Sequence, residues 1–366
     1  MRLLRLSANG FRNLNESVEL GRGLNIFVGE NGQGKTNWLE AATVLATTRS
    51  FRTSRLTEAV SFSESQAIIR GTVEESAEIV RDLQLSITGN TKSISVNGAK
   101  EPLRSYLSQL AVVVFESGEL DIVRGHPEAR RRFLDDGIVG LHPPFVQVFA
   151  DYTRVVKQKN ALLAKAADNG TQLNDVTTQL EPWNDQLAAL ATRIHKARMR
   201  YVERLNESFE RDLFGGETVS IRYVSSLEGK GDLNDYANLI TERLKLRVQA
   251  ELASGHSLIG THRDDLEIFF DGHELRKFGS SGQQRSAVLL LQLANINVFN
   301  TTRGEYPLFL IDDIDAELDY DRISRLLAFL DGKTQTIVTT SKEGFVEKFG
   351  SNATIFHVNA GNAEIQ

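Results

Sequence analysis

Residues Gly29–Thr36 read Gly-Glu-Asn-Gly-Gln-Gly-Lys-Thr and fit the phosphate-loop pattern G-x-x-x-x-G-K-[ST]. An apolar run, Leu24–Val28, precedes them, and a helix containing Trp38 and Leu39 is expected to follow. In such a loop the glycines let backbone N–H groups converge on phosphates, and the helix N-terminus adds a favourable field. The alternative is a glycine turn with a chance Lys-Thr, but the flanking strand and helix favour a phosphate site. We predict that Lys35 reaches the β- and γ-phosphates of ATP, that Thr36 ligates Mg²⁺, and that the loop residues contact the nucleotide: Gly29, Glu30, Asn31, Gly32, Gln33 and Gly34.

Two carboxylates end a second apolar run, Leu308–Ile311. We predict that Asp312 holds Mg²⁺ directly or through water, and that Asp313 orients or deprotonates the attacking water. Together with Lys35 they form the candidate catalytic set of an ATPase. Asp is shorter than Glu, so we expect slow hydrolysis. The alternative is an ordinary strand followed by an acidic turn, and the presence of the phosphate loop argues against it.

A third segment carries Ser280, Ser281, Gly282 and Gln283 before a leucine-rich helix. Small residues and Gln at a helix start can form an anion nest, or simply an N-cap, and both functions can coexist. The spacing Ser-x-Gly-Gln resembles the signature motif of ABC-type ATPases, which caps the γ-phosphate of a nucleotide on a partner subunit. The resemblance implies an ATP-dependent homodimer. It also places Asp319 in the D-loop, Thr339–Ser341 at the switch position, and Arg12 and Asn13 near the nucleotide.

The elements that must position these residues are read from hydrophobic periodicity. The middle of the chain has helical spacing from Phe145 to Leu163 and from Leu187 to Leu205, which predicts two antiparallel helices of about 20 residues joined by the polar stretch 168–172. Strand-like runs occur in the first and last thirds, and Gly89-Asn90 suits a hairpin turn. The predicted strands are Leu3–Ser7, Leu24–Val28, Gln66–Val73, Leu83–Thr88, Lys92–Val96, Ala111–Phe115, Val219–Val224, Leu266–Phe270, Leu308–Ile311, Thr336–Thr339 and Thr354–Val358.

This order predicts an α/β fold, namely a P-loop ATPase head of ABC/SMC type with an inserted helical arm domain. The predicted divisions are residues 1–115 for the first part of the head, 116–215 for the arm, and 216–366 for the second part of the head. Residues 233–253 are a further candidate for the arm. The long insertion between the two nucleotide motifs is unlike a compact transporter ATPase.

Composition narrows the class of protein. The chain has 366 residues, with 42 Lys and Arg against 48 Asp and Glu, giving a net charge of -6. Nucleic acid would therefore have to bind a local basic patch. There is no cysteine, which excludes disulfides and thiolate chemistry and fits a reducing compartment. No apolar run reaches the ~18–20 residues of a membrane span, and the N-terminus lacks the long apolar stretch of a signal peptide, so we expect a cytoplasmic protein without a membrane partner.

Four longer strings resemble one family, the RecF family of bacterial replication and recombinational repair proteins. They are Thr48–Thr53, Gly125–Asp135, Lys157–Leu163 and Gly260–Leu266, and their order and spacing agree with the family over nearly the whole chain. Departures include Thr261 where the family usually has Pro, and Ser281 where it usually has Gln. These departures leave open an orthodox member or a divergent branch with other partners.

The RecF resemblance implies an ATP-binding, weakly hydrolysing DNA clamp that dimerises on ATP. It implies binding at junctions of duplex and single strand and at gapped DNA, and action with RecO and RecR to let RecA load during replication, gap repair, DNA damage and the SOS response. DNA affinity would come from basic side chains and would be salt-sensitive. A solvated helix face is the alternative for these cations. The candidate DNA contacts are Arg193, Lys196, Arg198, Arg200, Lys157 and Lys159.

Two readings of other classes compete. The ATPase subunit of a membrane transporter would have a compact head and no DNA affinity. An SMC-like bridging protein would associate arm to arm, independently of DNA ends.

Overall fold

The computed structural model describes all residues except 77–78, 169–172 and 211–212, so the predicted loop between the arm helices lies mostly outside it. The chain divides into two compact units. The head unit consists of Met1–Leu120, Ser208–Thr218 and Ser280–Gln366. The arm unit consists of Asp121–Glu207 and Val219–Gly279.

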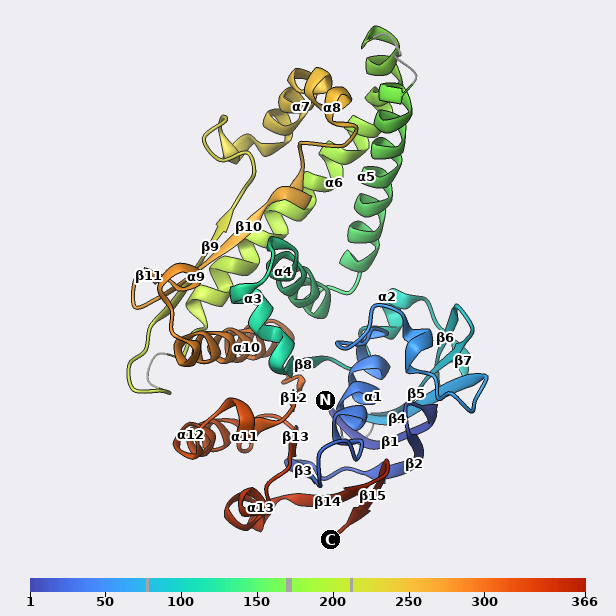
Figure 1. The fold of residues 1–366 in the computed structure, drawn as a ribbon, viewed down its shortest axis with the longest axis vertical. Helices are drawn as coiled ribbons and strands as arrows, with labels where there is room; N and C mark the ends of the chain where they lie inside the picture. Colours follow the sequence, from blue (N-terminus) through green and yellow to red (C-terminus); the bar gives the residue numbers. More distant parts are fainter. Residues whose placement is uncertain (77–78, 169–172, 211–212) are drawn as a thin grey trace. The chain divides into compact units, whose positions relative to one another are not determined.

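One sheet of the head unit joins strands from both ends of the chain (Figure 1). Its order is β15-β14-β3-β13-β12-β8, and all neighbours are parallel except the last hairpin, β14–β15. Because β3 and β8 pair with strands of the last third, the prediction of two halves of one α/β head is confirmed. These strands are β3 (Leu24–Val28), β8 (Val112–Phe115), β12 (Leu308–Ile311), β13 (Thr336–Thr340), β14 (Thr354–Asn359) and β15 (Asn362–Ile365).

The second sheet of the head is an antiparallel meander, as predicted, in the order β2-β1-β4-β5-β6-β7. Gly89 takes φ +52 in the predicted hairpin turn between β5 and β6, a left-handed conformation that glycine adopts without strain. β2 and the short β7 were not predicted. The strands are β1 (Arg2–Phe11), β2 (Leu14–Glu19), β4 (Gln66–Ser76), β5 (Ile79–Thr88), β6 (Thr91–Val96) and β7 (Ala99–Lys100).

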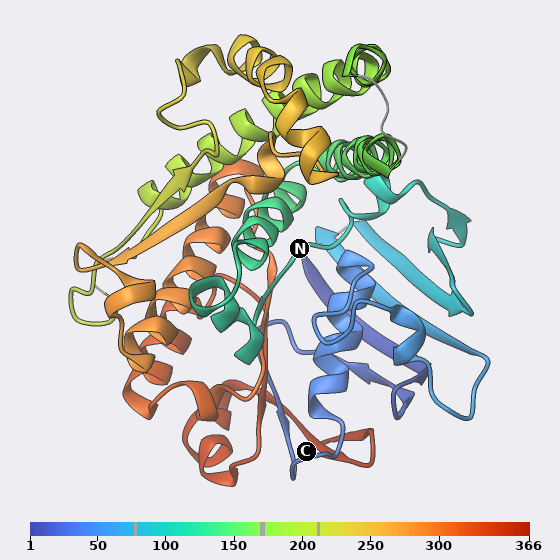
Figure 2. The ribbon, with the colours of Figure 1, turned by 45° about the horizontal axis from the view of Figure 1, so that its top comes forward.

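Helix α1 (Lys35–Thr47) follows the phosphate loop and packs between the two sheets of the head (Figure 2). It is buried nearly all round, and its side chains join both sheets in one hydrophobic core. Helix α10 (Ser281–Arg303) packs beside β8. The other helical segments of the head are η1 (Leu56–Ala59), α2 (Leu103–Tyr106), η2 (Ser117–Leu120), α11 (Ile314–Glu317), α12 (Tyr320–Leu330), α13 (Glu343–Phe349) and η5 (Gly350–Asn352).

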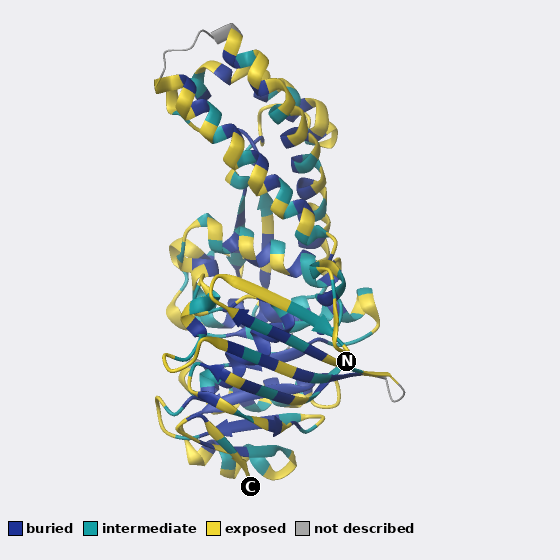
Figure 3. Ribbon diagram, turned by 90° about the vertical axis from the view of Figure 1, so that its right-hand side faces the viewer, coloured by how far each residue is buried: buried dark blue, intermediate teal, exposed yellow. Residues whose placement is uncertain are grey.

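The arm unit is built on two long helices, α5 (Phe145–Asp168) and α6 (Leu173–Glu207), which pack side by side. Helix α6 has 35 residues, so it is longer than the predicted 20 and continues through Pro182. Buried and exposed residues alternate along both helices, as expected for amphipathic helices (Figure 3). The remaining elements are α3 (Asp121–Arg124), α4 (Pro127–Leu141), β9 (Val219–Val224), η3 (Leu233–Asp235), α7 (Tyr236–Leu246), α8 (Val248–Ser254), η4 (Thr261–Arg263), β10 (Asp265–Phe270), β11 (His273–Glu274) and α9 (Leu275–Phe278).

The unit boundaries differ from the predicted divisions in one large segment. Residues 219–279 group with the arm unit, although only 233–253 had been considered for it. The physical reason is that β9 and β10 pair with each other in a separate three-stranded sheet, order β11-β10-β9, and β9 packs on α6. Among the described residues, no helix has the length and apolar character needed to cross a membrane.

Candidate functional site

The phosphate loop has the backbone geometry that its glycines permit. Gly32 and Gly34 take φ +83 and +113, and a Cβ on Gly34 would lie 2.9 Å from the side chain of Asn13. The Lys35 Nζ atom donates to the carbonyl oxygens of Gly29 at 2.7 Å and Glu30 at 2.9 Å. The loop is therefore wrapped around the lysine ammonium group, and Lys35 as a whole residue is buried.

The loop meets the acidic strand end at Thr36. Its hydroxyl donates to the two carboxylate oxygens of Asp312, at 2.9 and 3.0 Å, although the residues are 276 positions apart in the chain. Thr339, which lies in the neighbouring strand β13, donates to Asp312 at 2.7 Å. Since β3, β13 and β12 are adjacent and parallel, the carboxyl ends of three strands place these groups at one edge of the sheet.

Burial changes the protonation equilibria of the two charged groups in opposite directions. The pKa of Asp312 is raised by desolvation, and the hydrogen bonds from Thr339 and Thr36 oppose this shift. The pKa of Lys35 is lowered by desolvation, and the charges of Asp313, Asp312 and Asp315 oppose it. Burial disfavours the charged form of both side chains, so each charged form is stabilised by a partner of opposite charge.

Asp313 has an unusual backbone, with φ +52 and ψ +49, at the start of α11. Its N–H donates to the Thr339 hydroxyl at 2.7 Å. Non-glycine residues in the left-handed region cluster at functional sites, where the surrounding contacts stabilise them. The neighbouring Asp315 accepts from Thr340 at 2.6 Å and forms an ion pair with Lys342 at 3.1 Å, which the sequence analysis did not anticipate.

Arg12 is held by a carboxylate that sequence reasoning missed. Glu40, in α1, is 0% exposed and accepts from Arg12 Nε at 2.9 Å and Nη2 at 2.8 Å. It also accepts from Ser50 at 2.6 Å and lies 3.5 Å from Arg52. A lone Glu within the buried run Trp38-Leu39-Glu40-Ala41-Ala42 was the available signal, because a fully buried carboxylate needs partners.

Asn13, for which nucleotide contact is predicted, lies beside the phosphate loop. Its Nδ2 donates to the carbonyl of Gln33 at 3.3 Å, and its Oδ1 accepts from Asn37 at 2.7 Å. The Gln33 side chain in turn accepts from the backbone of Ala360 at 2.7 Å, at the β14–β15 turn. The phosphate loop is therefore hydrogen-bonded both to a residue near the start of the chain and to one near its end.

The signature-like segment forms a complete N-cap. Ser280 Oγ accepts from the Gln283 N–H at 3.3 Å, and Gln283 Oε1 accepts from the Ser280 N–H at 2.9 Å. This is a capping box, which confirms the N-cap alternative and leaves the anion-binding hypothesis open. Asp319 is the N-cap of α12, and its side chain accepts from the Arg322 N–H at 2.9 Å.

Two of the candidate DNA contacts are buried ion pairs, so their assignment to DNA was wrong. Lys159 is 0% exposed and pairs with the equally buried Glu251 at 2.7 Å. The side chain of Arg198 is 4% exposed and donates twice to Asp135, both at 2.8 Å. Helical periodicity alone did not show which cations face the interior. The other candidates, Arg193, Lys196, Arg200 and Lys157, are exposed.

Residues of the family-like string Gly260–Leu266 are organised around Asp264, which is fully buried in the arm unit. Asp264 accepts hydrogen bonds from the Tyr223 hydroxyl and the Ser226 N–H. Asp265 accepts from two guanidinium nitrogens of Arg130, Nε at 2.6 Å and Nη2 at 3.0 Å. Both carboxylates of this motif therefore have structural partners within the arm unit.

Comparisons with known proteins agree with this geometry. The family model described as the RecF/RecN/SMC N terminal domain matches residues 2–364. A protein named DNA replication and repair protein RecF from Enterococcus faecalis is 34% identical over 374 residues, covering 100% of this chain and 99% of the relative.

The chain belongs to the RecF family. A RecF from Synechocystis is 37% identical over 378 residues, covering 100% of this chain and 98% of the relative. A solved structure described as the recombination mediator protein RecF-ATP in the RecFOR pathway has a TM-score of 0.89 at 28% identity. It covers 100% of this chain and 97% of that chain. RecF membership also confirms the predicted head of ABC/SMC type.

Proposed function

We propose that this chain is an ATP-binding DNA clamp of the RecF type. The observation that carries the proposal is the meeting of Lys35, Thr36 and Asp312 at the strand edge, with the Thr36 hydroxyl on both oxygens of the carboxylate. Relatives named for DNA replication and repair, and a similar structure named RecF-ATP, support it.

The residues present fit ATP and Mg²⁺. The hydroxyl of Thr36 and the carboxylate of Asp312 are oxygen donors of the kind that Mg²⁺ prefers, and they already lie within 3.0 Å of each other. Gly32 has no atom within 4 Å of where a Cβ would be, so the loop is open at that point. When bound, the metal would neutralise charge on the phosphates.

The remaining roles in the head follow from position. Lys35 would leave its two carbonyl acceptors and contact the β- and γ-phosphates instead. Its ammonium group would then donate to charged acceptors, which form stronger hydrogen bonds than neutral ones. Asp313 would orient the attacking water. Its short side chain and its left-handed backbone conformation support slow hydrolysis. ATP would therefore act mainly as a switch.

Dimerisation is proposed from the signature segment. The N-terminus of α10 presents Ser280 to Gln283 with its first turn already ordered by the capping box, so a phosphate would not have to order it. A second subunit would supply this segment to the γ-phosphate, and Asp319 would lie in the D-loop of the same interface.

DNA binding is proposed for the exposed cations of the arm, Arg193, Lys196 and Arg200 on α6 and Lys157 on α5. They would contact phosphates, which makes binding salt-dependent and tolerant of sequence. We further propose that the clamp acts in the cytoplasm at gapped DNA with RecO and RecR, promoting the loading of RecA.

Light scattering tests the proposal. We expect a monomer without nucleotide, a dimer with ATP, and a further mass increase with gapped duplex DNA. A transporter subunit would bind ATP without binding DNA, and a bridging protein would associate without regard to DNA ends. A monomer in every condition despite bound ATP would contradict the role given to the signature segment.

A further inference from the structure

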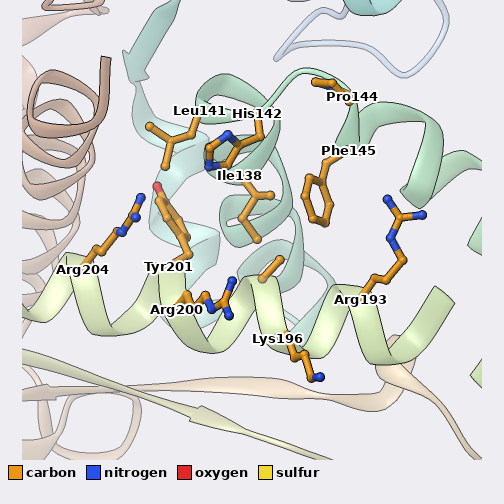
Figure 4. Close-up of a pocket in the computed structure, with 11 residues that line it drawn as sticks. Ile138, Leu141, His142, Pro144, Phe145, Arg193, Lys196, Arg200, Tyr201 and Arg204 are labelled. Carbon is orange, nitrogen blue, oxygen red and sulfur yellow. The ribbon is translucent and has the colours of Figure 1, made fainter. Parts of the chain in front are cut away.

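The arm unit contains a pocket of about 520 Å³ between the end of α4, the start of α5 and the C-terminal half of α6 (Figure 4). Its wall is formed largely by apolar side chains from two sequence regions. These side chains are Ile138, Leu141, Pro144, Phe145, Ala197 and Tyr201. The pocket is therefore built for an apolar group, although nothing in the nucleotide chemistry of the head uses it.

Helix α6 places a row of cations at the same pocket. Arg193, Lys196, Arg200 and Arg204 all line it, and their spacing of three or four residues puts them on one face of the helix. From Arg193 to Arg204 the row extends about 16 Å at 1.5 Å per residue. At 3.4 Å per phosphate along a strand, that length matches about five phosphates.

Three cations of this row, Arg193, Lys196 and Arg200, have exposed side chains. Within the part of the chain that the structure describes, Arg193, Lys196 and Arg200 are exposed and have no ion-pair or hydrogen-bond partner. Arg154, an exposed cation on α5, differs from these three because it pairs with Asp151 at 2.9 Å. Three solvated charges left beside an apolar pocket indicate a ligand that is both anionic and apolar.

Two aromatic side chains line the pocket, Tyr201 and Phe145, and of the two it is Phe145 that keeps exposed surface. Tyr201 is buried, and a Cβ on Gly137 would lie 2.1 Å from its hydroxyl, so the absence of a side chain at Gly137 lets the ring pack against α4. Phe145 is half-buried, and its ring lies 6.0 Å from that of Phe149. Aromatic rings beside cations are the combination on which unpaired bases stack while their phosphates are held.

We propose that this pocket takes an unpaired base of DNA while the α6 cations hold the neighbouring phosphates. The inference deepens the proposed DNA-binding function and rests on it. It accounts for discrimination between a strand with free bases and a blunt duplex, because a paired base has no face available to the pocket. Cation contacts alone would bind both forms equally.

The test compares tailed duplex, blunt duplex and a tail of abasic residues, each titrated with the full chain at fixed salt. We expect the tailed duplex to bind about ten-fold more tightly than the other two, because that difference lies within the affinity that one stacked base contributes. A 2-aminopurine in the tail should change its fluorescence on binding. Equal affinity for normal and abasic tails, with blunt duplex also bound, would overturn the pocket and leave the DNA function standing. No binding to any DNA would contradict the proposed function itself.

Two variants of opposite design guard against misfolding. Phe145→Ala removes aromatic surface, whereas Ala197→Phe fills the pocket without removing a side chain from it. Both should abolish the preference for tails and the 2-aminopurine signal while retaining blunt-duplex binding. If both fold, by circular dichroism, and keep the preference, the proposal is refuted.

A matched pair of lysines tests the cation row. Lys196→Ala should weaken tailed and blunt DNA alike and reduce the slope of log K against log salt by about one. Lys245→Ala, an exposed lysine on α7 of the same unit, should do neither. An acidic peptide with one aromatic residue is titrated as well, because a protein segment of that chemistry is the alternative ligand for the pocket. If the pocket variants lose that peptide and keep the preference for tails, the site binds protein and the proposal fails.

Discussion

Removing Arg12 should lower the free energy of unfolding of the head more than neutralising Glu40, the carboxylate that binds Arg12. In Arg12→Ala, Glu40 stays at 0% exposure and keeps only Ser50 and the more distant Arg52. An uncompensated buried charge of this kind costs about 3–5 kcal/mol. In Glu40→Gln the buried group is neutral and can still accept a hydrogen bond, and the Arg12 side chain, 22% exposed, can reach water. We expect that loss to be about 1–2 kcal/mol.

The double variant Arg12→Met/Glu40→Leu gives the sharper test. It removes both charges, so it should be more stable than Arg12→Met alone. In a cycle with the single variants Arg12→Met and Glu40→Leu, the coupling energy of the pair should be about 2 kcal/mol. Full recovery is not expected, because Ser50 also loses its acceptor.

Urea unfolding followed by fluorescence measures these differences. The chain has two tryptophans, and Trp38 lies in the core of the head unit while Trp183 lies in α6. A Trp183→Phe background therefore lets Trp38 report on the head. Arg5→Ala, which removes an exposed arginine whose Nε donates to Ser17 on the same sheet, serves as the control and should cost under about 0.5 kcal/mol. A loss in Glu40→Gln equal to that in Arg12→Ala, or purely additive losses in the double variant, would refute the reasoning.

Three further predictions concern the switch and the arm. Lys35→Ala should abolish ATP-dependent dimerisation by light scattering, and unchanged ATP affinity in this variant would count against the phosphate-loop role. Ser280→Arg should keep ATP binding and block dimerisation, whereas Ser280→Ala, which loses the same N-cap at about 1 kcal/mol, should still dimerise. His195 is buried against Tyr236, and burial lowers its pKa to about 4 from 6.5. The unfolded chain binds the proton first, so folding stability should fall by about 3 kcal/mol between pH 6.5 and 4, and His195→Phe should remove that loss in melts at pH 7 and 4.5.

Much of the head could be predicted because its chemistry is local in sequence. The pattern Gly29–Thr36 specifies a loop, its strand and its helix within a few residues, since the glycines and the flanking apolar runs act over short range. The apolar strand ending in Asp312 is equally self-contained. Parallel pairing then follows from general rules for α/β sheets, which is why the meeting of Thr36 and Asp312 was foreseeable.

The arm was less predictable, because helical periodicity identifies a helix but not the face that each charged residue takes in the tertiary fold. Lys159 and Arg198 belong to the same basic pattern as Lys157 and Arg200, yet the first two are buried with acidic partners from distant segments. Those partners, Glu251 and Asp135, have no sequence signal that links them to a particular cation.

The sequence by itself determined the nucleotide motifs, most of the strands and membership of the RecF family, since each rests on residue types at short spacing. Only the tertiary structure decided that Glu40 holds Arg12, that residues 219–279 fold with the arm unit, and that cations of α6 line an apolar pocket. The physical reason is the same in each case. Burial and ion pairing depend on which surfaces meet in space, and side chains far apart in the chain settle that together.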